Sequence, residues 1–566
     1  MSLCFVKHIA YVYNFTKNLN YHHTMNNAVF NFEDPKNENV LNYEPKSNER
    51  SNLIKELEKQ SKQQIEIPLI IGGKEIRTGK IGKVVMPHDH KHVLATYHMS
   101  TEKEVKLAID EAMKARKEWA DLSWVVRSSI LVKAADLMSI RYRFLLNAAT
   151  MLGQSKNAYQ AEIDSACEAI DFLRYNAYFA SKIYSSQPKS GFNQLNRMEY
   201  RSLEGFVFTV SPFNFTAIAS NLNMAPVLMG NTTLWKPATT SILSNYYLMQ
   251  VFKEAGLPDG VINFVPGSGS LIGGIAIQNK DLGGIHFTGS NKTFNSLWSS
   301  VSENLKNYKS YPRIVGETGG KDFVFVHPSA KPLEVAVGII RGAFEYQGQK
   351  CSAASRSYIP KSLWAETKKY LVEMCSEIKI GDVREFSNFM NAVIDESAFD
   401  TIMNYIEEAK QSTVAKIITG GKGNKSKGYF IEPTIIETND PYFKTMQEEI
   451  FGPVMTIYVY DDIDLDKTLD LCDSTSPYGL TGAIFSNDRV AAAHACNKLR
   501  YAAGNFYIND KPTGAMVGFQ PFGGARGSGT NDKAGGELNL LRWTSPRTIK
   551  ETFAPATDYK YPFMMS

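Results

Sequence analysis

Cysteine and long apolar runs are both scarce in this 566-residue chain. Its six cysteines are widely separated, and no two of them form a CxxC pair. Such spacing argues against a disulfide framework and a structural zinc site, and it favours a reducing compartment. No apolar stretch approaches the ~20 residues that span a bilayer. The sequence therefore predicts neither a disulfide-stapled scaffold, nor a metal centre, nor a membrane-spanning protein.

The chain also lacks a large excess of charge of either sign. Sixty-two basic residues against 58 acidic ones leave a net charge of +4, and no run of Lys and Arg indicates nucleic-acid binding. Hydrophobic residues make up 43% of the chain and charged residues 21%, which is ordinary for a globular protein and excludes wholesale disorder. At roughly 150 residues per domain, the length predicts three to four domain-sized units. This composition suits an enzyme and excludes a fibre.

The amino terminus lacks acidic residues. Residues 1–32 contain no Asp or Glu, two lysines and three histidines. An acid-free leader with hydroxyl and aromatic residues is compatible with a mitochondrial transit peptide, although the arginines typical of such peptides are absent. We therefore interpret residues 1–33 as a transit peptide or a disordered leader. The polar stretch 34–52 is interpreted as a linker.

Helical spacing dominates the chain up to residue 180. Apolar residues mostly three or four apart predict helices from residue 101 onward and over 125–138 and 158–180, and residues 53–62 predict a short exposed helix. Residues 67–71 predict a strand, followed by the hairpin signal Gly72-Gly73. Residues 181–202 break the helical pattern and indicate an extended linker or a hairpin.

Short apolar strands alternate with helices from residue 205 onward. We expect strands at 205–210, 232–235, 261–265, 284–287, 323–326, 357–359 and 454–459, and a helix at 333–347 among those between them. This alternation is typical of βαβ units and a parallel sheet, which binds ligands at the carboxyl ends of its strands. No internal repeat is evident, so we expect two different α/β lobes.

Cys351 lies in the turn GQKCS (348–352), between a predicted helix and a predicted strand. A thiol in a glycine-containing turn can be exposed at a cleft, and positive charge nearby favours the nucleophilic thiolate. Lys350 is adjacent in sequence but could point away. The alternative is a buried structural cysteine, which is the interpretation that we give to Cys167, Cys375, Cys472 and Cys496.

Glu317 and Asn214 are two further candidates. Glu317 lies among the glycines of GETGGK (316–321), which let a carboxylate swing and a cofactor approach the backbone. Asn214 follows a strand end, where its amide could donate to a developing oxyanion. Each could instead be an ordinary turn residue. A GxGxxG motif is absent, and Gly289-Ser290 opens a helix whose N-terminus could hold a phosphate.

Seven motifs resemble the aldehyde dehydrogenase superfamily in their order and separation. They are SPFNFT (211–216), LWKP (234–237), FTGS (287–290), GETGGKD (316–322), GQKCS (348–352), EEIFGPV (448–454) and PFGG (521–524). The resemblance runs from about residue 35 to the end. Further strings resemble one branch, whose members oxidise L-glutamate γ-semialdehyde in mitochondria: QAEID (160–164), AFEYQGQKCSA (343–353), GNFYINDK (504–511), GTNDKAGG (529–536) and LRWTSP (541–546).

The resemblance implies an α/β fold with a Rossmann-type cofactor domain, an α/β catalytic domain and a small β oligomerisation element. By this resemblance, residues 34–180 and 203–316 form the NAD-binding domain and residues 317–520 the catalytic domain. Residues 181–202 and 540–566 form the oligomerisation element of a homodimer.

The resemblance also implies roles for individual residues. Cys351 would be the nucleophile and Glu317 the general base, and Asn214 with the Cys351 backbone N–H would form the oxyanion hole. The residues implied to contact NAD are Ser211, Lys236, Gly289, Ser290, Asn291, Lys292, Thr293, Glu449 and Phe451. Those implied to form the substrate pocket are Glu162, Phe213, Ser352, Gly514, Ala515 and Phe522. No metal is implied.

Three positions depart from the family pattern. Thr239 stands where many members carry a Glu that repels a 2′-phosphate, so exclusion of NADP is weakened and NADP is expected as a weaker cofactor. FTGSNKTF lacks the second glycine of the wider superfamily. Ala515 stands where some branch members have Ser, although a backbone N–H can still anchor a carboxylate there.

We therefore expect NAD-dependent oxidation of L-glutamate γ-semialdehyde to L-glutamate in proline catabolism, in the mitochondrial matrix, through a thiohemiacetal and a thioester. The partner is a small-molecule substrate, with no nucleic acid or membrane. The alternatives are another semialdehyde or aliphatic aldehyde, a non-catalytic binding protein, and a thiol esterase. Intact Cys351, Glu317 and Asn214 disfavour the binding protein, while Lys236 and Glu449 disfavour the esterase.

Overall fold

The computed structural model describes residues 32–565, so the leader predicted for residues 1–33 falls almost wholly outside the described part. The chain divides into the units Met1–Glu33 and Asp34–Ser566, and the second unit carries the elements described below. Within residues 32–565, no helix has the length and apolar character needed to cross a membrane.

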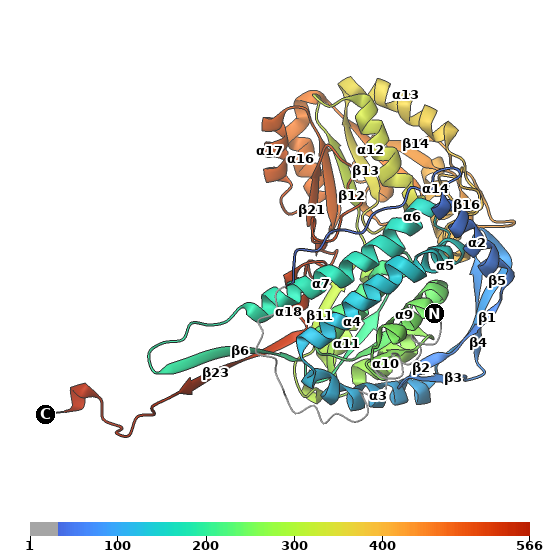
Figure 1. Cartoon of the computed structure of the whole chain (residues 1–566). Helices are drawn as coiled ribbons and strands as arrows, with labels where there is room; N and C mark the ends of the chain where they lie inside the picture. Colours follow the sequence, from blue (N-terminus) through green and yellow to red (C-terminus); the bar gives the residue numbers. More distant parts are fainter. Residues whose placement is uncertain (1–31, 566) are drawn as a thin grey trace. The chain divides into compact units, whose positions relative to one another are not determined.

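The first lobe is built on a seven-stranded sheet with the order β11-β10-β7-β8-β9-β2-β3. Figure 1 labels β11 from one edge of this sheet and β2 and β3 from the other. Its parallel strands are β7 (Phe206–Val210), β8 (Thr233–Lys236), β9 (Ile262–Phe264), β10 (Leu282–Thr288) and β11 (Arg313–Glu317). All except β11 lie where the apolar runs predict them. Because β8 lies on one side of β7 and β10 on the other, the chain crosses over at β7, and ligands bind at the carboxyl edge of such a switch point.

An antiparallel hairpin completes this sheet. The strand predicted at 67–71 is divided into β1 (Ile65–Ile67) and β2 (Leu69–Ile71), and β2 turns at Gly72-Gly73 into β3 (Lys74–Ile76), which confirms the hairpin signal. β1 belongs to a small separate sheet with β5 (Asp89–His98) and β4 (Ile81–Met86).

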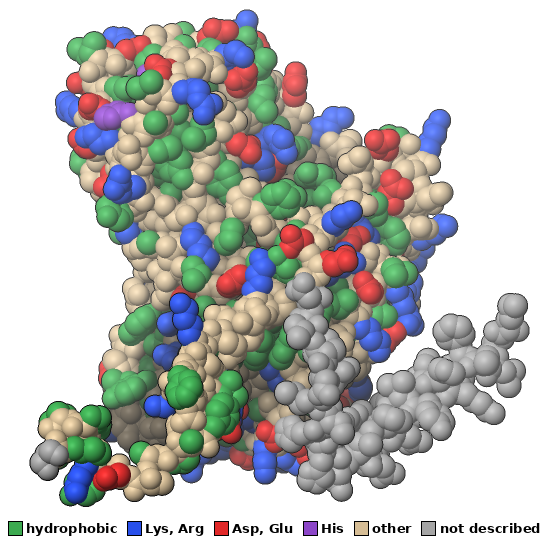
Figure 2. All heavy atoms as spheres, turned by 60° about the vertical axis from the view of Figure 1, so that its left-hand side comes forward, with side chains coloured by type: hydrophobic (Ala, Val, Ile, Leu, Met, Phe, Trp, Pro, Cys, Tyr) green, Lys and Arg blue, Asp and Glu red, His purple; other side chains and the backbone are tan. Residues whose placement is uncertain are grey.

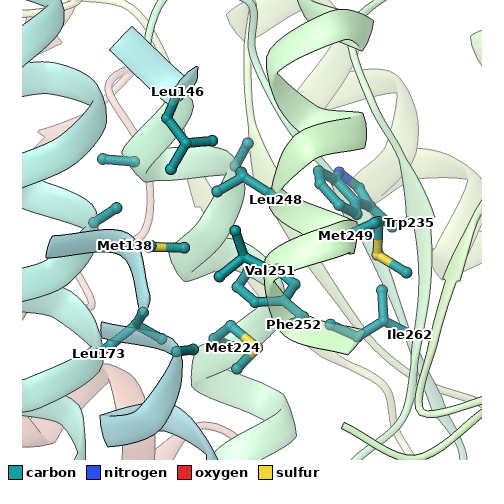
Figure 3. Packing of buried hydrophobic residues seen from close by; sticks show 14 of the residues in the cluster. Met138, Leu146, Leu173, Met224, Trp235, Leu248, Met249, Val251, Phe252 and Ile262 are labelled. Carbon is teal, nitrogen blue, oxygen red and sulfur yellow. The ribbon is translucent and has the colours of Figure 1, made fainter. Parts of the chain in front are cut away.

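Helices bury the first sheet. They are α3 (Glu102–Asp121), α4 (Trp124–Leu137), α5 (Arg143–Gln154), α8 (Thr216–Leu228), α9 (Ile242–Ala255), α10 (Gly269–Gln278) and α11 (Asn291–Glu303). Figure 3 shows Val251 and Phe252 of α9 between Met138 on one side and Trp235 of β8 on the other. Each such side chain contributes about 1.5–3 kcal/mol when fully buried. This packing makes the sheet a rigid support for its carboxyl edge.

The second lobe has its own seven-stranded sheet, in the order β14-β17-β18-β13-β12-β20-β21. Its strands are β12 (Asp322–Val326), β13 (Ala354–Pro360), β14 (Ala415–Thr419), β17 (Thr434–Thr438), β18 (Val454–Tyr460), β20 (Thr481–Phe485) and β21 (Asn505–Ile508). All pair in parallel except β14. Helices α12 (Pro332–Phe344), α13 (Lys361–Glu377), α14 (Glu396–Gln411), α16 (Leu465–Ser474) and α17 (Arg489–Lys498) pack around it. The helix predicted at 333–347 ends three residues early.

Strands β6 (Gln194–Ser202) and β23 (Thr544–Thr552) pair antiparallel over nine residues and project as a ribbon (Figure 1). Residues 181–202 are therefore neither a linker nor a hairpin of their own. The pairing partner lies more than 300 residues away in sequence, so no local signal could reveal it.

Residues 34–52 are not a linker. The Glu38 carboxylate pairs with Arg143 and Arg174, each at 2.7 Å. Helix α2 (Asn48–Lys62) begins at Asn48, five residues before the predicted start, and buries Leu53 and Leu57 rather than lying exposed. The polar residues of this segment find partners about a hundred residues along the chain, which their composition cannot show.

The helix predicted at 158–180 is interrupted. It consists of α6 (Ala158–Ala161), a π-helical turn η2 (Glu162–Cys167) and α7 (Glu168–Ser185). A π turn inserts extra residues into the helical repeat, so side chains beyond it face a different direction from that which a 3.6-residue period predicts.

Candidate active site

Cys351 follows a strained stretch of backbone between α12 and β13. Tyr346 and Gln347 have φ values of 51° and 55°, a left-handed conformation that is rare for residues other than glycine. This conformation ends α12 early. Tyr346 Oη donates to Gln154 O at 2.9 Å, and Gln347 Nε2 donates to Ser155 O at 3.0 Å. The end of α5, in the first lobe, thus holds the turn that carries the thiol.

Cys351 and Glu317 meet between the two lobes. Cys351 Sγ donates to Glu317 Oε1 at 3.9 Å, and Glu317 is the last residue of β11. Burial, reinforced by nearby carboxylates, raises the pKa of the Cys351 thiol well above its ordinary value. Burial also raises the pKa of Glu317 to about 7, against the opposing effects of Lys533 and of the hydrogen bond from Cys351. The pair is a neutral thiol beside a carboxyl group that titrates near neutral pH, where a general base is most effective.

Asn214 lies beyond the carboxyl end of β7 and is 3% exposed. Its Nδ2 donates to the backbone carbonyl of Gln349, two residues before Cys351, at 3.1 Å. The amide group carries two N–H donors, and this bond uses one of them. The structure thus brings Asn214 to the turn that carries Cys351, which we call the nucleophile turn after the predicted role of its thiol.

The candidate cofactor residues gather at the carboxyl edge of the first sheet. Ser211 directly follows β7, Lys236 ends β8, and Gly289 and Ser290 connect β10 to α11. Burial lowers the pKa of Lys236. Ser211 Oγ accepts a hydrogen bond from the Trp235 indole at 2.9 Å.

The N-terminus of α11 faces this edge. Ser290 caps the helix, because its Oγ accepts from Thr293 N at 3.3 Å. Asn291 Nδ2 donates to Gly527 O at 2.7 Å. The N-terminus of a 13-residue helix concentrates backbone N–H donors and partial positive charge, which suit a phosphate.

A cavity of about 820 Å³ is lined by Lys292 of α11 and, from the second lobe, by Glu449. Glu449 Oε1 accepts from Gly320 N at 3.1 Å, and burial raises the pKa of Glu449 to about 7. Two residues on, Phe451 has a φ of 56°, and its ring meets that of Phe213 edge to face with centroids 5.8 Å apart. The Glu449 carboxylate suits the hydroxyl groups of a dinucleotide, and the Lys292 ammonium group and the N-terminus of α11 suit its phosphates.

The predicted substrate residues near Cys351 also converge. Ser352 Oγ donates to Thr513 Oγ1 at 3.0 Å, which places Ser352 beside the loop that continues through Gly514 and Ala515. Gly514 has a φ of +97°, a conformation that favours glycine. Phe522 lines a pocket together with Glu317.

The prediction that Glu162 lines the substrate pocket is wrong. Glu162 is fully buried, and its carboxylate accepts from Tyr43 Oη at 2.6 Å, Asn147 Nδ2 at 2.7 Å and Arg143 Nε at 3.0 Å. Leu41 N donates to the same carboxylate at 2.9 Å. These partners satisfy both carboxylate oxygens, and Glu162 is not among the residues that line the pocket of Glu317.

Glu168 and Lys533 line the pocket of Glu317 and were not predicted. Glu168 lies six residues beyond Glu162, on the other side of the π turn, and burial together with nearby Asp164 raises its pKa well above the ordinary value. Helical periodicity cannot tell which of these two glutamates faces the pocket, because the π turn changes the register. Lys533 belongs to the motif GTNDKAGG, whose lysine carried no assigned role.

Three comparisons place the chain among known proteins. The model of the aldehyde dehydrogenase family matches residues 76–549. The mitochondrial delta-1-pyrroline-5-carboxylate dehydrogenase of Dictyostelium discoideum is 52% identical over 541 residues, which cover 95% of this chain and 97% of that one. The human mitochondrial protein of the same name is 49% identical over 530 residues, with 93% and 94% covered.

The fold agrees with these sequence relationships. The crystal structure of the Mycobacterium tuberculosis delta-pyrroline-5-carboxylate dehydrogenase bound with NAD superposes with a TM-score of 0.92 and 48% identity, covering 95% of this chain and all of that one. The family model matches most of the chain, and several relatives cover almost all of it. The chain belongs to the aldehyde dehydrogenase family.

Proposed function

We propose that this protein oxidises L-glutamate γ-semialdehyde, the hydrolysed form of 1-pyrroline-5-carboxylate, to L-glutamate with NAD⁺ in proline catabolism. The observation that carries this proposal is the contact between Cys351 and Glu317, next to the loop of Ser352 and Gly514. It is supported by relatives about 50% identical that are named for 1-pyrroline-5-carboxylate, several of them mitochondrial. The same relatives support the mitochondrial matrix as the location.

The cofactor edge fits NAD. Lys236 and Glu449 would hold the ribose hydroxyl groups, and the N-terminus of α11 would face the phosphates. Ser211 and the residues 289–293 border the same edge. When bound, NAD⁺ supplies the hydride acceptor.

The first chemical step is the attack of sulfur on the aldehyde carbon. The Cys351 thiol already donates to Glu317, so this carboxylate would accept the thiol proton as the C–S bond forms. The aldehyde oxygen becomes an oxyanion, which the second N–H of Asn214 and the backbone N–H of Cys351 would stabilise. Hydride then leaves the tetrahedral carbon, which becomes a thioester.

Water must hydrolyse this thioester. Glu317 would take a proton from the water after its first proton has been released to solvent, and a pKa of about 7 allows that release at neutral pH. The hydroxyl group adds to the thioester carbon, the C–S bond breaks, and L-glutamate leaves with Cys351 restored.

Substrate choice would come from the carboxylate at the far end of the substrate. Ser352 and the N–H groups near Gly514 and Ala515 are the proposed donors. Each hydrogen bond to a charged group is worth about 1.5–3 kcal/mol. Two or three such bonds should favour glutamate semialdehyde over propanal by at least about a hundredfold in kcat/KM.

The test compares NADH formation from glutamate semialdehyde, succinate semialdehyde and propanal. Replacing Gly514 with Val should erase most of the preference while sparing the weak activity on propanal. Cys351→Ala should abolish oxidation of all three substrates yet retain NAD binding. Equal wild-type efficiency on propanal and glutamate semialdehyde would contradict the substrate assignment.

We further propose a homodimer in which the ribbon of β6 and β23 is the oligomerisation element. The proposed domains are residues 34–180 and 203–316 for NAD binding and 317–520 for catalysis, with the boundary at Glu317, which is itself the last residue of β11 in the sheet of the first lobe. Import should remove roughly the first 20–35 residues. A fluorescent fusion that stays in the cytosol would contradict this location.

A further inference from the structure

A lysine ammonium group lies against the glycine of the proposed carboxylate-binding loop. Gly514 has no side chain, and apart from its chain neighbours the atom nearest to the position of its missing Cβ is Lys511 Nζ, at 3.3 Å. Gly514 follows Thr513, which accepts a hydrogen bond from Ser352, the residue next to the nucleophile. The Lys511 ammonium group therefore lies close to the loop that a hydrogen bond from Ser352, the neighbour of Cys351, holds beside the nucleophile turn.

Buried contacts fix this ammonium group in place. Lys511 Nζ pairs with Glu345 Oε2 at 2.9 Å, and the two side chains are 12% and 4% exposed. Glu345 Oε1 accepts from Arg341 Nε at 2.8 Å. Burial acts to raise the pKa of Glu345, but Lys350, Lys511 and Arg341 outweigh it and the pKa is lowered. Glu345 is thus an ionised carboxylate shared by two paired cations.

A second cluster of one carboxylate and two lysines includes Lys350, the residue before Cys351. Lys350 Nζ is 3.4 Å from Asp164 Oδ2, and Lys156 Nζ is 2.5 Å from the same oxygen. In each group one carboxylate serves two cations. Together the two groups hold four cationic side chains against two carboxylates. All of these side chains except that of Arg341 are at most 12% exposed, and charges interact more strongly there than in bulk solvent.

We propose that Lys511 is a specificity-determining residue, which selects aldehydes that carry a carboxylate at their far end. This inference rests on the proposed function and adds to it the residue that supplies the charge. Its ammonium group attracts the substrate carboxylate toward the N–H donors of the loop, and Glu345 positions it. A neutral aldehyde gains nothing from this charge. Since the attraction acts on bound substrate and transition state alike, it should appear in KM rather than kcat.

The test uses Lys511→Met and Lys511→Arg in the full chain, with glutamate semialdehyde, succinate semialdehyde and propanal. We expect Lys511→Met to raise KM for both semialdehydes about tenfold, with kcat changed by less than about twofold and propanal unaffected. Lys511→Arg should restore most of the affinity. The matched control is Lys498→Met, which removes a lysine from the surface of the same lobe, where it pairs with Asp470.

A second variant separates charge from folding. In Glu345→Gln/Lys511→Met both partners are removed, so no uncompensated carboxylate is left beside the loop. The KM increase should persist in this variant, and its recovery would show that unpaired Glu345, rather than the missing ammonium group, caused the effect. Equal losses on propanal and the semialdehydes, or an unchanged KM, would overturn the proposal. The substrate assignment fails separately, if the wild-type protein does not prefer glutamate semialdehyde to propanal.

Discussion

The proposed mechanism gives Glu317 two tasks that require different protonation states. Glu317 would accept the proton of Cys351 when sulfur attacks, and it would have to be ionised again before it could activate water. A carboxyl group with an ordinary pKa near 4.5 would be a weak base for the second task. Burial at the end of β11 raises the pKa to about 7, so both forms are populated at physiological pH.

Glu317→Gln should therefore slow thioester hydrolysis more than hydride transfer. We expect an early burst of NADH followed by slow turnover, measured by stopped-flow absorbance, whereas Cys351→Ala should give no burst. In the wild-type protein the base is the ionised form, so kcat should fall as pH decreases through about 7 and level off above it. Loss of the burst in Glu317→Gln would contradict this expectation, because it would show that no other group can replace Glu317 in accepting the thiol proton and that sulfur attack is the more sensitive step.

Thr239 bears on cofactor choice. It is exposed in the short helix η3 (Thr239–Ser241), three residues beyond Lys236, and it carries no charge to repel a 2′-phosphate. Wild-type protein should use NADP⁺ measurably but less well than NAD⁺. Thr239→Glu should reduce kcat/KM for NADP⁺ by at least about tenfold while sparing NAD⁺, and Thr239→Gln serves as the uncharged control. If NADP⁺ were wholly inert with the wild-type protein, another element would have to exclude it.

At the scale of elements, the π turn η2 decides which of two glutamates lines the pocket that contains Glu317. Glu162, the first residue of this turn, accepts hydrogen bonds from Arg143 of α5 and from Tyr43 of the amino-terminal segment. Glu168, just beyond it, lines the pocket of Glu317. The same turn therefore holds Leu41 and Tyr43 on one side, and Glu168, which follows it directly, lines the pocket on the other.

Replacing Glu162 with Gln should destabilise the protein without changing its substrate preference. Removing one partner of a buried ion pair leaves the other charge unbalanced, which costs about 3–5 kcal/mol. We expect about 3 kcal/mol from urea unfolding, because Arg143 retains its pair with Glu38. Glu334→Gln, in the exposed pair with Lys331, should cost less than about 1 kcal/mol. If Glu162→Gln instead lost activity selectively on glutamate semialdehyde, Glu162 would have to be a substrate-binding residue after all.

At the scale of the whole molecule, the site exists only where the two lobes meet. Glu317 and Asn214 come from the first lobe, whereas Cys351 comes from the second. The ribbon of β6 and β23 projects away from both lobes, and Figure 2 shows hydrophobic side chains along the projecting arm. Leu195 is 41% exposed and Phe553 64%. A two-stranded ribbon is marginally stable alone, so a partner surface is expected to cover it.

Leu195→Asp combined with Phe553→Asp should therefore weaken dimerisation. Light scattering should give twice the mass of one chain for the wild-type protein and a concentration-dependent fraction of monomer for the variant. Thr552→Asp, which adds a charge at the same end of the ribbon without removing an apolar side chain, is the control. A wild-type protein that is monomeric at micromolar concentration would contradict the proposed homodimer.

Much of the site could be predicted because its signals are local. The short apolar strands β7, β8 and β10 end in motifs that carry Asn214, Lys236 and Ser290, and parallel strands bring their carboxyl ends to one edge of a sheet. The glycines around Glu317 and before Cys351 likewise predict turns from the sequence alone.

Other features of the protein depend on contacts between residues that are distant in sequence, and only the tertiary structure determines them. The polar segment 34–52 pairs with helices a hundred residues away, β6 pairs with the end of the chain, and Lys511 meets Gly514 while it is held by Glu345. The directions in which the Glu162 and Glu168 side chains point depend on a π turn that hydrophobic periodicity does not reveal. The sequence by itself determined the strand pattern and the chemical types of the site residues, because these follow from neighbours along the chain. Burial, charge partners and the register of a helix come from packing in three dimensions, and these set the pKa of Glu317 and the charge at the pocket.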